Sequence, residues 1–342
     1  MIALLSRSQL DATAWDACVA ASSQQIVYGY SWYLDAVLPT PAWKWVGLAQ
    51  IDEVGQYRAV MPIPLRRKRI AGVLYRWVVH QPFFCQVLGV FSCNESLDPQ
   101  PFFDLMTRQF RYGSSYVARR PFANTDQTID HRFYTTHILN LQVGYEALYQ
   151  NYTRDRKLNL RRAVTVDWTI VNSADPEPLL DLFRKYHAAT IEGGVAGWAY
   201  SIFRNLVDEL RKRGLIILRY AMKNERIEAG ALFVCANNRV IYLFNAASPV
   251  GRRGNARTLL IDQCIREKAG QKLLFDFESP MKLSVRDFYQ SFGTTEEPFL
   301  NLRWNRLNSV EKAFLTIRTN WLKKQKAYHQ DTLLLPSQEI ED

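Results

Sequence analysis

Two carboxylates on one predicted strand are the side chains best placed to do chemistry. Residues 272–278 read KLLFDFE, and the period of two along a strand puts Asp276 and Glu278 on the same face. Their Cα atoms would lie about 7 Å apart. Carboxylates in an apolar element are costly unless they are paired or used. The pattern therefore predicts either general acid–base catalysis or a structural ion pair with a neighbouring arginine.

A segment rich in glycine and arginine precedes this strand. Residues 251–256 read GRRGNA and open a predicted helix that ends at Gly270. The first N–H groups of a helix lack intrahelical partners and, together with the helix dipole, attract anions. Gly254 and Ala256 would let a phosphate approach the backbone around Asn255. Three arginines would add charge-assisted contacts: Arg252, Arg253 and Arg257. The segment predicts an anion site, with a solvated loop as the alternative.

The net charge also favours an anionic partner. The chain of 342 residues carries a formal charge of +10, and its basic residues form clusters at 66–69, 154–162 and 318–326. Net charge bears on solubility and long-range attraction rather than on fold. Each cluster can also form an ordinary solvated face.

Composition and missing motifs exclude several classes of protein. With 48% hydrophobic and 22% charged residues the chain is globular rather than disordered. Its start resembles no signal peptide, and the apolar region 72–91 is interrupted by Arg76 and His80, so we expect a cytoplasmic protein without a membrane span. Five cysteines form no CxxC pair and five histidines no metal motif, so we expect no metal. The signatures HExxH, GxSxG, GxxxxGK(S/T) and GxGxxG are absent as well.

The second half of the chain has a clear predicted order of elements, β-α-α-β-β-β-α-β-α-β. The assignment rests on alternating β-branched residues for strands and on caps and apolar periodicity for helices. The predicted elements span 165–171, 175–191, 200–213, 215–223, 227–236, 239–247, the helix after 256, 272–278, 284–292 and 298–304. Asn237-Asn238 suits a tight hairpin turn.

The first half predicts a looser version of the same plan. We expect helices at 11–22, 30–38 and 102–110, a strand pair at 44–52 and 57–67, and further strands at 82–91 and 134–141. No segment like 251–256 occurs between residues 91 and 103.

The order of the second half, with a glycine-containing turn between its fourth strand and the next helix, resembles the GNAT acyltransferase fold. The family's pyrophosphate loop reads Q/R-x-x-G-x-G/A, and here Gly251 stands at the first position. Two such halves, with an RxxNxRRA-type helix at 156–163, FDF at 275–277 and FG at 292–293, look like the FemAB-like or BioF2-like tandem-GNAT family.

The resemblance implies an α+β fold of two tandem GNAT-like domains with mixed, mostly antiparallel sheets. We expect residues 1–142 to form a domain without a pyrophosphate loop. Residues 143–305 would contain linker helices and the donor site, and 306–342 a basic helix and tail.

The resemblance further implies an N-acyltransferase that uses acetyl-CoA or another acyl-CoA as co-substrate. The donor pyrophosphate would lie at residues 252–257, and the preceding strand would offer Asn245 and Ala246 to the pantetheine arm. Asp276 and Glu278 would move protons. Tyr289 falls where many GNAT enzymes place the tyrosine that protonates the leaving thiolate, although packing in the core would also explain it.

The acceptor is expected to be an anionic small molecule or cell-envelope precursor in a cleft between the domains. Its predicted contacts are Arg156, Asn159, Arg161, Arg162, Glu192 and Trp198. One alternative is an aminoacyl-tRNA-dependent peptidyltransferase of the FemAB type, which the charge favours and which would bind tRNA. A second is a basic nucleic-acid-binding module on a degenerate GNAT fold. Gly251 favours this alternative because it stands where the family's pyrophosphate loop has Gln or Arg. We expect a monomer or a homodimer.

Overall fold

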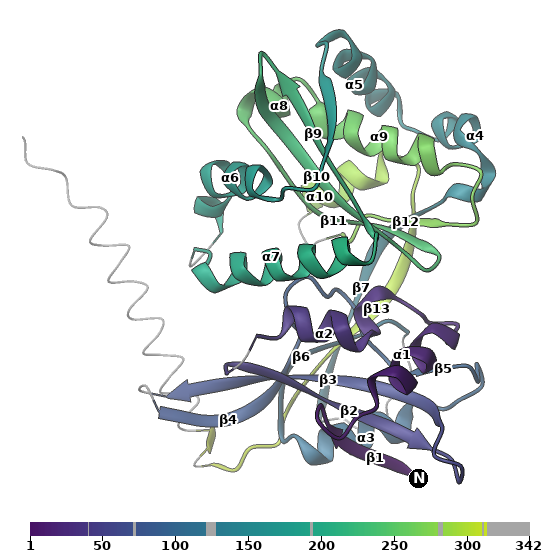
Figure 1. Ribbon diagram of the computed structural model, residues 1–342, viewed down its shortest axis with the longest axis vertical. Coiled ribbons are helices and arrows are strands. Elements are labelled where there is room, and N and C mark those ends of the chain that lie inside the picture. Colours follow the sequence, from purple (N-terminus) through teal and green to yellow (C-terminus); the bar gives the residue numbers. More distant parts are fainter. Residues whose placement is uncertain are drawn as a thin grey trace, which may run out of the picture.

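One large sheet runs through the molecule. The computed structural model describes residues 1–39, 41–70, 73–120, 128–191, 194–279, 283–309 and 311–312, and the predicted basic helix and tail lie almost entirely outside these ranges. Within them, thirteen mostly antiparallel strands follow the order β1-β2-β3-β4-β6-β13-β7-β12-β11-β10-β9-β8, with β5 on β3. Figure 1 shows a lower lobe built from the first half and an upper lobe built from the second. The fold is the expected mixed α+β type.

The first half contains more strands than the sequence predicted. Its elements are β1 (Ile2–Ser6), α1 (Ala12–Ala21), η1 (Val27–Gly29), α2 (Ser31–Val37), β2 (Trp43–Ile51), β3 (Tyr57–Ile70), β4 (Val73–His80), β5 (Phe91–Ser92), α3 (Gln100–Gln109), β6 (Tyr112–Ala118), β7 (Ile129–Asn140) and η2 (Leu141–Val143). The strand expected at 82–91 is wrong. Phe84 there has a φ of 57°, which breaks an extended run, and the segment forms a turn at residues 83–84 followed by irregular, mostly buried chain.

The second half follows the predicted order. Its elements are α4 (Tyr145–Gln150), α5 (Arg154–Thr165), β8 (Thr169–Ser173), α6 (Glu177–Tyr186), η3 (Ala188–Thr190), α7 (Gly197–Lys212), β9 (Ile216–Lys223), β10 (Arg226–Ala236), β11 (Arg239–Ala247), α8 (Pro249–Arg253), α9 (Ala256–Lys268), β12 (Leu274–Asp276), α10 (Leu283–Gln290) and β13 (Thr295–Asn305). The hairpin turn at Asn237 is confirmed by its φ of 56°.

The last strand of each half pairs with the other half. Strand β7 lies beside β12, and β13 lies between β6 and β7. Both strands run between the lobes in Figure 1. The predicted boundary at residue 142 therefore falls after a strand that already belongs to the second half's sheet.

Apolar packing also joins the two halves. One cluster of buried side chains extends from Trp15 of α1 and Leu34 of α2 to Leu179 of α6 and Ile202 of α7. A second cluster packs α9 and α10 against the opposite face of the second half's sheet, for example through Leu260. Helices α2 and α7 face each other where the lobes meet (Figure 1). Residues from the first half are thus held in place beside β12.

Candidate active site

Strand β12 ends after three residues, and the chain then turns sharply at Glu278. Glu278 has a left-handed φ of 49°, so it does not continue the predicted alternation. The turn is stabilised because the Asp276 carboxylate accepts the Glu278 N–H at 3.0 Å and the Thr136 hydroxyl at 2.9 Å. Asp276 and Glu278 consequently occupy different environments.

Asp276 belongs to a buried ion-pair network. Arg239, only 1% exposed, lies 2.6 Å from the Asp276 carboxylate and 2.6 Å from that of Glu297 on β13. Buried ions are tolerated when they are paired and hydrogen bonded in this way. The geometry gives Asp276 the structural ion pair that was the alternative to catalysis.

Glu278 has a hydrogen-bond donor from the other half instead of a cation. The Tyr28 hydroxyl, in η1, donates to the Glu278 carboxylate at 2.5 Å. Burial is the main reason why the pKa of Glu278 rises to about 8, and the Tyr28 hydrogen bond acts in the opposite direction. A carboxyl with a pKa in this range can take a proton near neutral pH and give it up again.

The residue after Glu278 is anchored to β7. The His137 N–H donates to the Ser279 hydroxyl at 3.1 Å, and the His137 Nδ1 lies 2.8 Å from the same oxygen. The Ser279 N–H in turn donates to the Thr136 hydroxyl at 3.1 Å. Residues from the first half thus fix the backbone on both sides of the Glu278 side chain.

Strand β11 parts from β12 beside this turn. Their parallel pairing covers only Arg239 to Ile241 on β11, and a bulge at Leu243 interrupts the pairing with β10. The edge that follows contains Asn245 and Ala246, as predicted for the strand that precedes the anion segment. Asn245 accepts a hydrogen bond from Arg257 at 3.0 Å, which ties this edge to the start of α9.

Two tyrosines lie close to the point where the strands part. The Tyr242 and Tyr289 rings are 6.2 Å apart, and both residues are buried. Burial raises the pKa of both hydroxyl groups, so both are protonated at neutral pH. The Tyr242 hydroxyl has no hydrogen-bond partner among the described residues. Sequence reasoning missed Tyr242 because it sits in the apolar run VIYLF, which reads as core.

The predicted anion segment consists of two helices separated by a short turn. Residues 251–253 belong to α8 rather than to a loop, and Asn255, with a φ of 54°, precedes the first residue of α9. The Asn255 side chain does not cap α9. An uncapped helix start that carries Arg257, with exposed Arg252 and Arg253 nearby, has the chemistry to hold a phosphate.

The two glycines of the segment have packing reasons. A Cβ on Gly251 would lie 2.1 Å from the carbonyl oxygen of Glu228, so the family's Gln or Arg at this position would require the backbone to shift. A Cβ on Gly254 would lie 2.4 Å from the Trp168 ring, whose N–H donates to the Gly254 carbonyl at 3.0 Å. Gly254 is thus explained by contact with Trp168, independently of any phosphate.

Helix α5 does not face the first half. Figure 1 places it at the far end of the upper lobe, where it packs on α9. Arg156 is buried and donates to the Thr258 hydroxyl at 2.6 Å and to the Ser291 hydroxyl at 2.8 Å. Asn159 is half-buried and Arg161 and Arg162 are exposed on this outer helix. The structure therefore does not bring these residues to the junction of the halves.

Trp198 is the predicted acceptor residue that does lie at the junction. Its ring is 5.5 Å from Phe83 and 6.4 Å from Trp43, both in the first half, and the Arg66 guanidinium lies 5.8 Å from its centre. Burial and the nearby charges of Arg66, Lys68 and Arg303 lower the pKa of His80 beside this cluster to about 4. Glu192 lies outside the described residues.

Neither a metal-binding cluster nor a membrane-spanning helix occurs among the described residues. No group of three His, Cys, Asp or Glu side chains in these ranges could hold a metal ion. None of the helices described above is long and apolar enough to cross a membrane.

Comparisons with known proteins agree with this architecture. Residues 148–278 match the family described as acetyltransferase (GNAT) domain. No curated protein matches the chain. Among solved structures the chain is similar to FemX, with 13% identity, a TM-score of 0.59, and coverage of 85% of this chain and 96% of that one. It is also similar to a tandem GNAT protein from the clavulanic acid biosynthesis pathway, with 10% identity, a TM-score of 0.50, and coverage of 89% and 98%.

A third similar structure is the C-terminal domain of a putative lysylphosphatidylglycerol synthetase from Agrobacterium fabrum. It shares 14% identity at a TM-score of 0.52, with coverage of 93% of this chain and 98% of that one. Identities this low establish the fold alone. The family match therefore indicates a GNAT acetyltransferase domain over residues 148–278, and the similar structures show the fold of a tandem GNAT protein.

Proposed function

We propose that this tandem GNAT protein is an N-acyltransferase that moves an acyl group from acyl-CoA to an amine on an anionic acceptor, with Glu278 as the general base. The observation that carries the proposal is the Glu278 carboxyl. It is free of a cationic partner among the described residues, has a pKa of about 8, and sits where β11 and β12 part.

The donor would bind along the route from α9 to the β11 edge. The uncapped start of α9 and Arg257 suit the pyrophosphate. The unpaired β11 edge at Asn245 and Ala246 offers backbone groups to the pantetheine arm, and the unpartnered Tyr242 hydroxyl is a candidate donor to the thioester carbonyl. Arg257 links both parts through its hydrogen bond to Asn245.

Two protein groups would carry the protons of the reaction, and transfer of a proton from Glu278 to Tyr289 after each turnover would restore both. Glu278, once ionised, accepts a proton from the attacking amine as the N–C bond forms. Tyr289 stays protonated because burial raises its pKa, so it can donate a proton to the thiolate as the C–S bond breaks. The charge of Glu278 also helps to raise the pKa of Tyr289, which supports the proposal that the two groups act together.

The acceptor would lie at the junction of the halves rather than on α5. A chain of contacts connects Glu278 to this junction: Tyr28 packs against Tyr33 with ring centres 5.4 Å apart, and the Tyr33 hydroxyl donates to the Phe84 carbonyl, next to Phe83. The cations around His80 would suit an anionic group, and Trp198 with Phe83 would contact its apolar part.

The donor assignment is tested by thermal shift. We expect acetyl-CoA or a longer acyl-CoA to stabilise the protein by about 2.7 kcal/mol at a hundred times its dissociation constant. Arg257→Ala should weaken this effect, whereas Lys268→Ala, at the other end of α9, should not. Stabilisation by aminoacyl-tRNA but by no acyl-CoA would replace the proposed donor with tRNA.

A further inference from the structure

Four phenylalanine side chains meet where α6, α7 and β11 approach the first half. They are Phe84 of the first half, Phe183 of α6, Phe203 of α7 and Phe244 of β11. The Phe244 ring centre lies 4.6 Å from that of Phe203 and 5.0 Å from that of Phe183. The Phe84 ring centre is 6.0 Å from that of Phe244. Phe203 is buried, whereas the other three keep part of their surface exposed. This phenylalanine cluster therefore has apolar surface that a ligand can cover.

The cluster lies on the face of the second half's sheet that is opposite to α9. Phe244 and Ala246 pack with α6 and α7 on this face, whereas the Asn245 side chain accepts a hydrogen bond from Arg257 of α9 on the other. Strands β11 and β12 pair only as far as Ile241. A donor with its pyrophosphate at the start of α9 would pass between the strands beyond that point. Its acyl group would then emerge on the face that carries the phenylalanine cluster.

Phe84 belongs to a turn that contacts the chain next to the proposed base. The Nε2 of Gln86, two residues further on, lies 3.5 Å from the carbonyl oxygen of Ser279, which follows Glu278. Phe84 itself has a left-handed φ of 57°, which costs free energy for a large side chain. The Tyr33 hydroxyl holds the turn by donating to the Phe84 carbonyl. Residues strained in this way persist where the surrounding structure holds them, and they cluster at ligand sites.

The cluster also reaches the β11 edge, through Phe183. The His187 ring is stacked on the Phe183 ring, with centres 6.0 Å apart and planes 6° from parallel. The His187 Nε2 lies 3.1 Å from the nitrogen of Ala247, the last residue of β11. An acyl chain that continues from a pantetheine arm at this edge would therefore meet Phe183 and Phe244.

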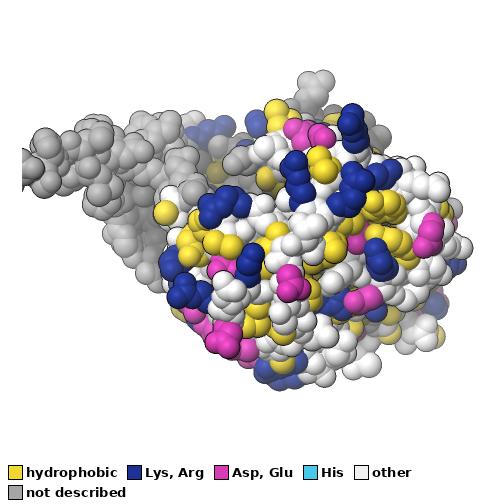
Figure 2. Space-filling model, turned by 90° about the horizontal axis from the view of Figure 1, so that it is seen from above, with side chains coloured by type: hydrophobic (Ala, Val, Ile, Leu, Met, Phe, Trp, Pro, Cys, Tyr) yellow, Lys and Arg dark blue, Asp and Glu magenta, His cyan; other side chains and the backbone are white. Residues whose placement is uncertain are grey.

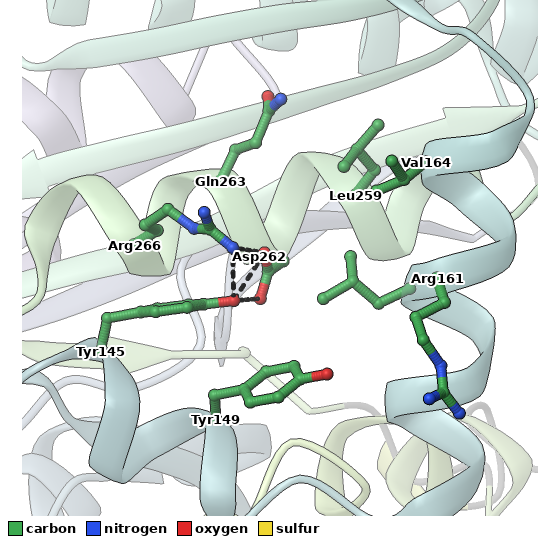
Figure 3. A pocket seen from close by; sticks show the side chains of 9 residues that line it. Tyr145, Tyr149, Arg161, Val164, Leu259, Asp262, Gln263 and Arg266 are labelled. Atoms are coloured by element: carbon green, nitrogen blue, oxygen red, sulfur yellow. Dashed lines mark hydrogen bonds and ion pairs between the residues drawn. The ribbon is translucent and has the colours of Figure 1, made fainter.

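The α9 side of the sheet has a different character. A pocket of about 460 Å³ between α4, α5 and α9 contains polar side chains that already bind one another. The Tyr145 hydroxyl lies 2.9 and 3.1 Å from the two Asp262 oxygens, and the Tyr145 and Tyr149 rings are stacked 5.9 Å apart (Figure 3). Over the outer end of this half, Lys and Arg side chains are interspersed with Asp and Glu (Figure 2). An apolar chain would find less to contact on these surfaces than at the four phenylalanines.

We propose that the phenylalanine cluster binds the acyl chain of the donor, and that the donor is an acyl-CoA whose chain is longer than acetyl. This inference rests on the donor site proposed above. The chain would lie against Phe84, Phe183 and Phe244 and remove their exposed surface from water, which stabilises the complex in proportion to the apolar area covered. Phe83 and Trp198 remain for the acceptor, so the acyl chain and the acceptor contact different side chains.

Calorimetric titration of the full-length protein with CoA, acetyl-CoA, butyryl-CoA and hexanoyl-CoA tests the proposal without an acceptor. Each methylene group that becomes buried tightens binding about fourfold. Affinity should therefore rise along the series, and hexanoyl-CoA should bind at least about tenfold more tightly than acetyl-CoA. CoA itself should bind no more tightly than acetyl-CoA, because it has no acyl group to place against the rings.

Variants locate the chain. Phe84→Gly removes one ring and keeps the turn, because glycine adopts a left-handed φ without strain. It should lower the affinity of hexanoyl-CoA relative to acetyl-CoA about fourfold or more, as if at least one methylene group lost its contact. Phe244→Trp puts a larger ring in the path and should weaken hexanoyl-CoA while acetyl-CoA keeps its affinity. Phe133→Ala is the matched control, because Phe133 is 66% exposed on β7 and lies outside the cluster. Melting temperatures report whether each variant is folded.

The results that would overturn the inference differ in what they say of the proposed function. Equal affinities of acetyl-CoA and hexanoyl-CoA would mean that the chain does not contact the cluster. An affinity ratio that neither Phe84→Gly nor Phe244→Trp changes would mean the same. Both outcomes leave the proposed donor site standing. Binding of no CoA derivative would refute the donor site itself, and this inference with it.

Discussion

Replacing Tyr28 with Phe removes one hydroxyl from the first half and tests how that half contributes to the proposed base. The hydroxyl donates to Glu278 at 2.5 Å and thereby lowers a pKa that burial has raised to about 8. Without it the ionised carboxylate loses a stabilising partner, whereas the protonated form loses little. The pKa of Glu278 should therefore rise further.

The size of the shift follows from the strength of such a bond. A hydrogen bond to a charged group contributes about 1.5–3 kcal/mol, and one pKa unit corresponds to about 1.4 kcal/mol, so the rise should be about one to two units. At pH 7 only about a tenth of Glu278 is ionised when its pKa is about 8. The ionised fraction, and with it kcat/KM at pH 7, should fall about 10- to 100-fold in the variant.

The pH dependence of kcat/KM distinguishes this effect from damage to the fold. The acid limb of the profile should move to higher pH by about one to two pH units, the size derived above. The rate at high pH should recover to that of the natural protein. Tyr33→Phe is the matched control, because Tyr33 packs on Tyr28 but donates to the Phe84 carbonyl. A Tyr28→Phe enzyme whose acid limb stays in place would refute Glu278 as the titrating base.

Further expectations concern stability. Burial raises the pKa of Glu278 from 4.5, its value in the unfolded chain, to about 8 in the folded protein. Its contribution to stability is therefore fully present below pH 4.5 and is lost as the pH rises through about 8. Glu278→Gln should raise the melting temperature, relative to the natural protein, more at pH 9 than at pH 5. Arg239→Ala should cost about 3–5 kcal/mol in urea unfolding, since it leaves a buried carboxylate unpaired. Gly251→Ala should cost about 1–3 kcal/mol because its Cβ would overlap the Glu228 carbonyl. Arg156→Ala should destabilise by about 2–4 kcal/mol and leave the acceptor KM unchanged, which steady-state kinetics with both substrates varied would check.

Local patterns account for the parts of the fold that the sequence predicted well. The second half follows its predicted order because each strand and helix there carries its own periodicity, cap or turn signal, such as the left-handed Asn237 in the hairpin. The segment 82–91 misled the prediction because irregular buried chain and a buried strand have the same apolar composition. The exchange of β7 and β13 between the halves has no local signal at all, since strand partners are chosen by the whole sheet.

The sequence by itself determined the strand that carries Asp276, the start of α9 and the tyrosine on α10, because residue type and spacing are enough to place them, but it wrongly continued the strand through Glu278. It could not separate Asp276 from Glu278, which differ only through partners more than thirty residues away, Arg239 for one and Tyr28 for the other. It also placed Arg156 and Arg161 at an acceptor site, whereas helix packing turns Arg156 into the core and leaves Arg161 in an outer pocket. The roles of charged side chains were decided by tertiary contacts, because burial and partners, not residue type, set the free energy of a charge.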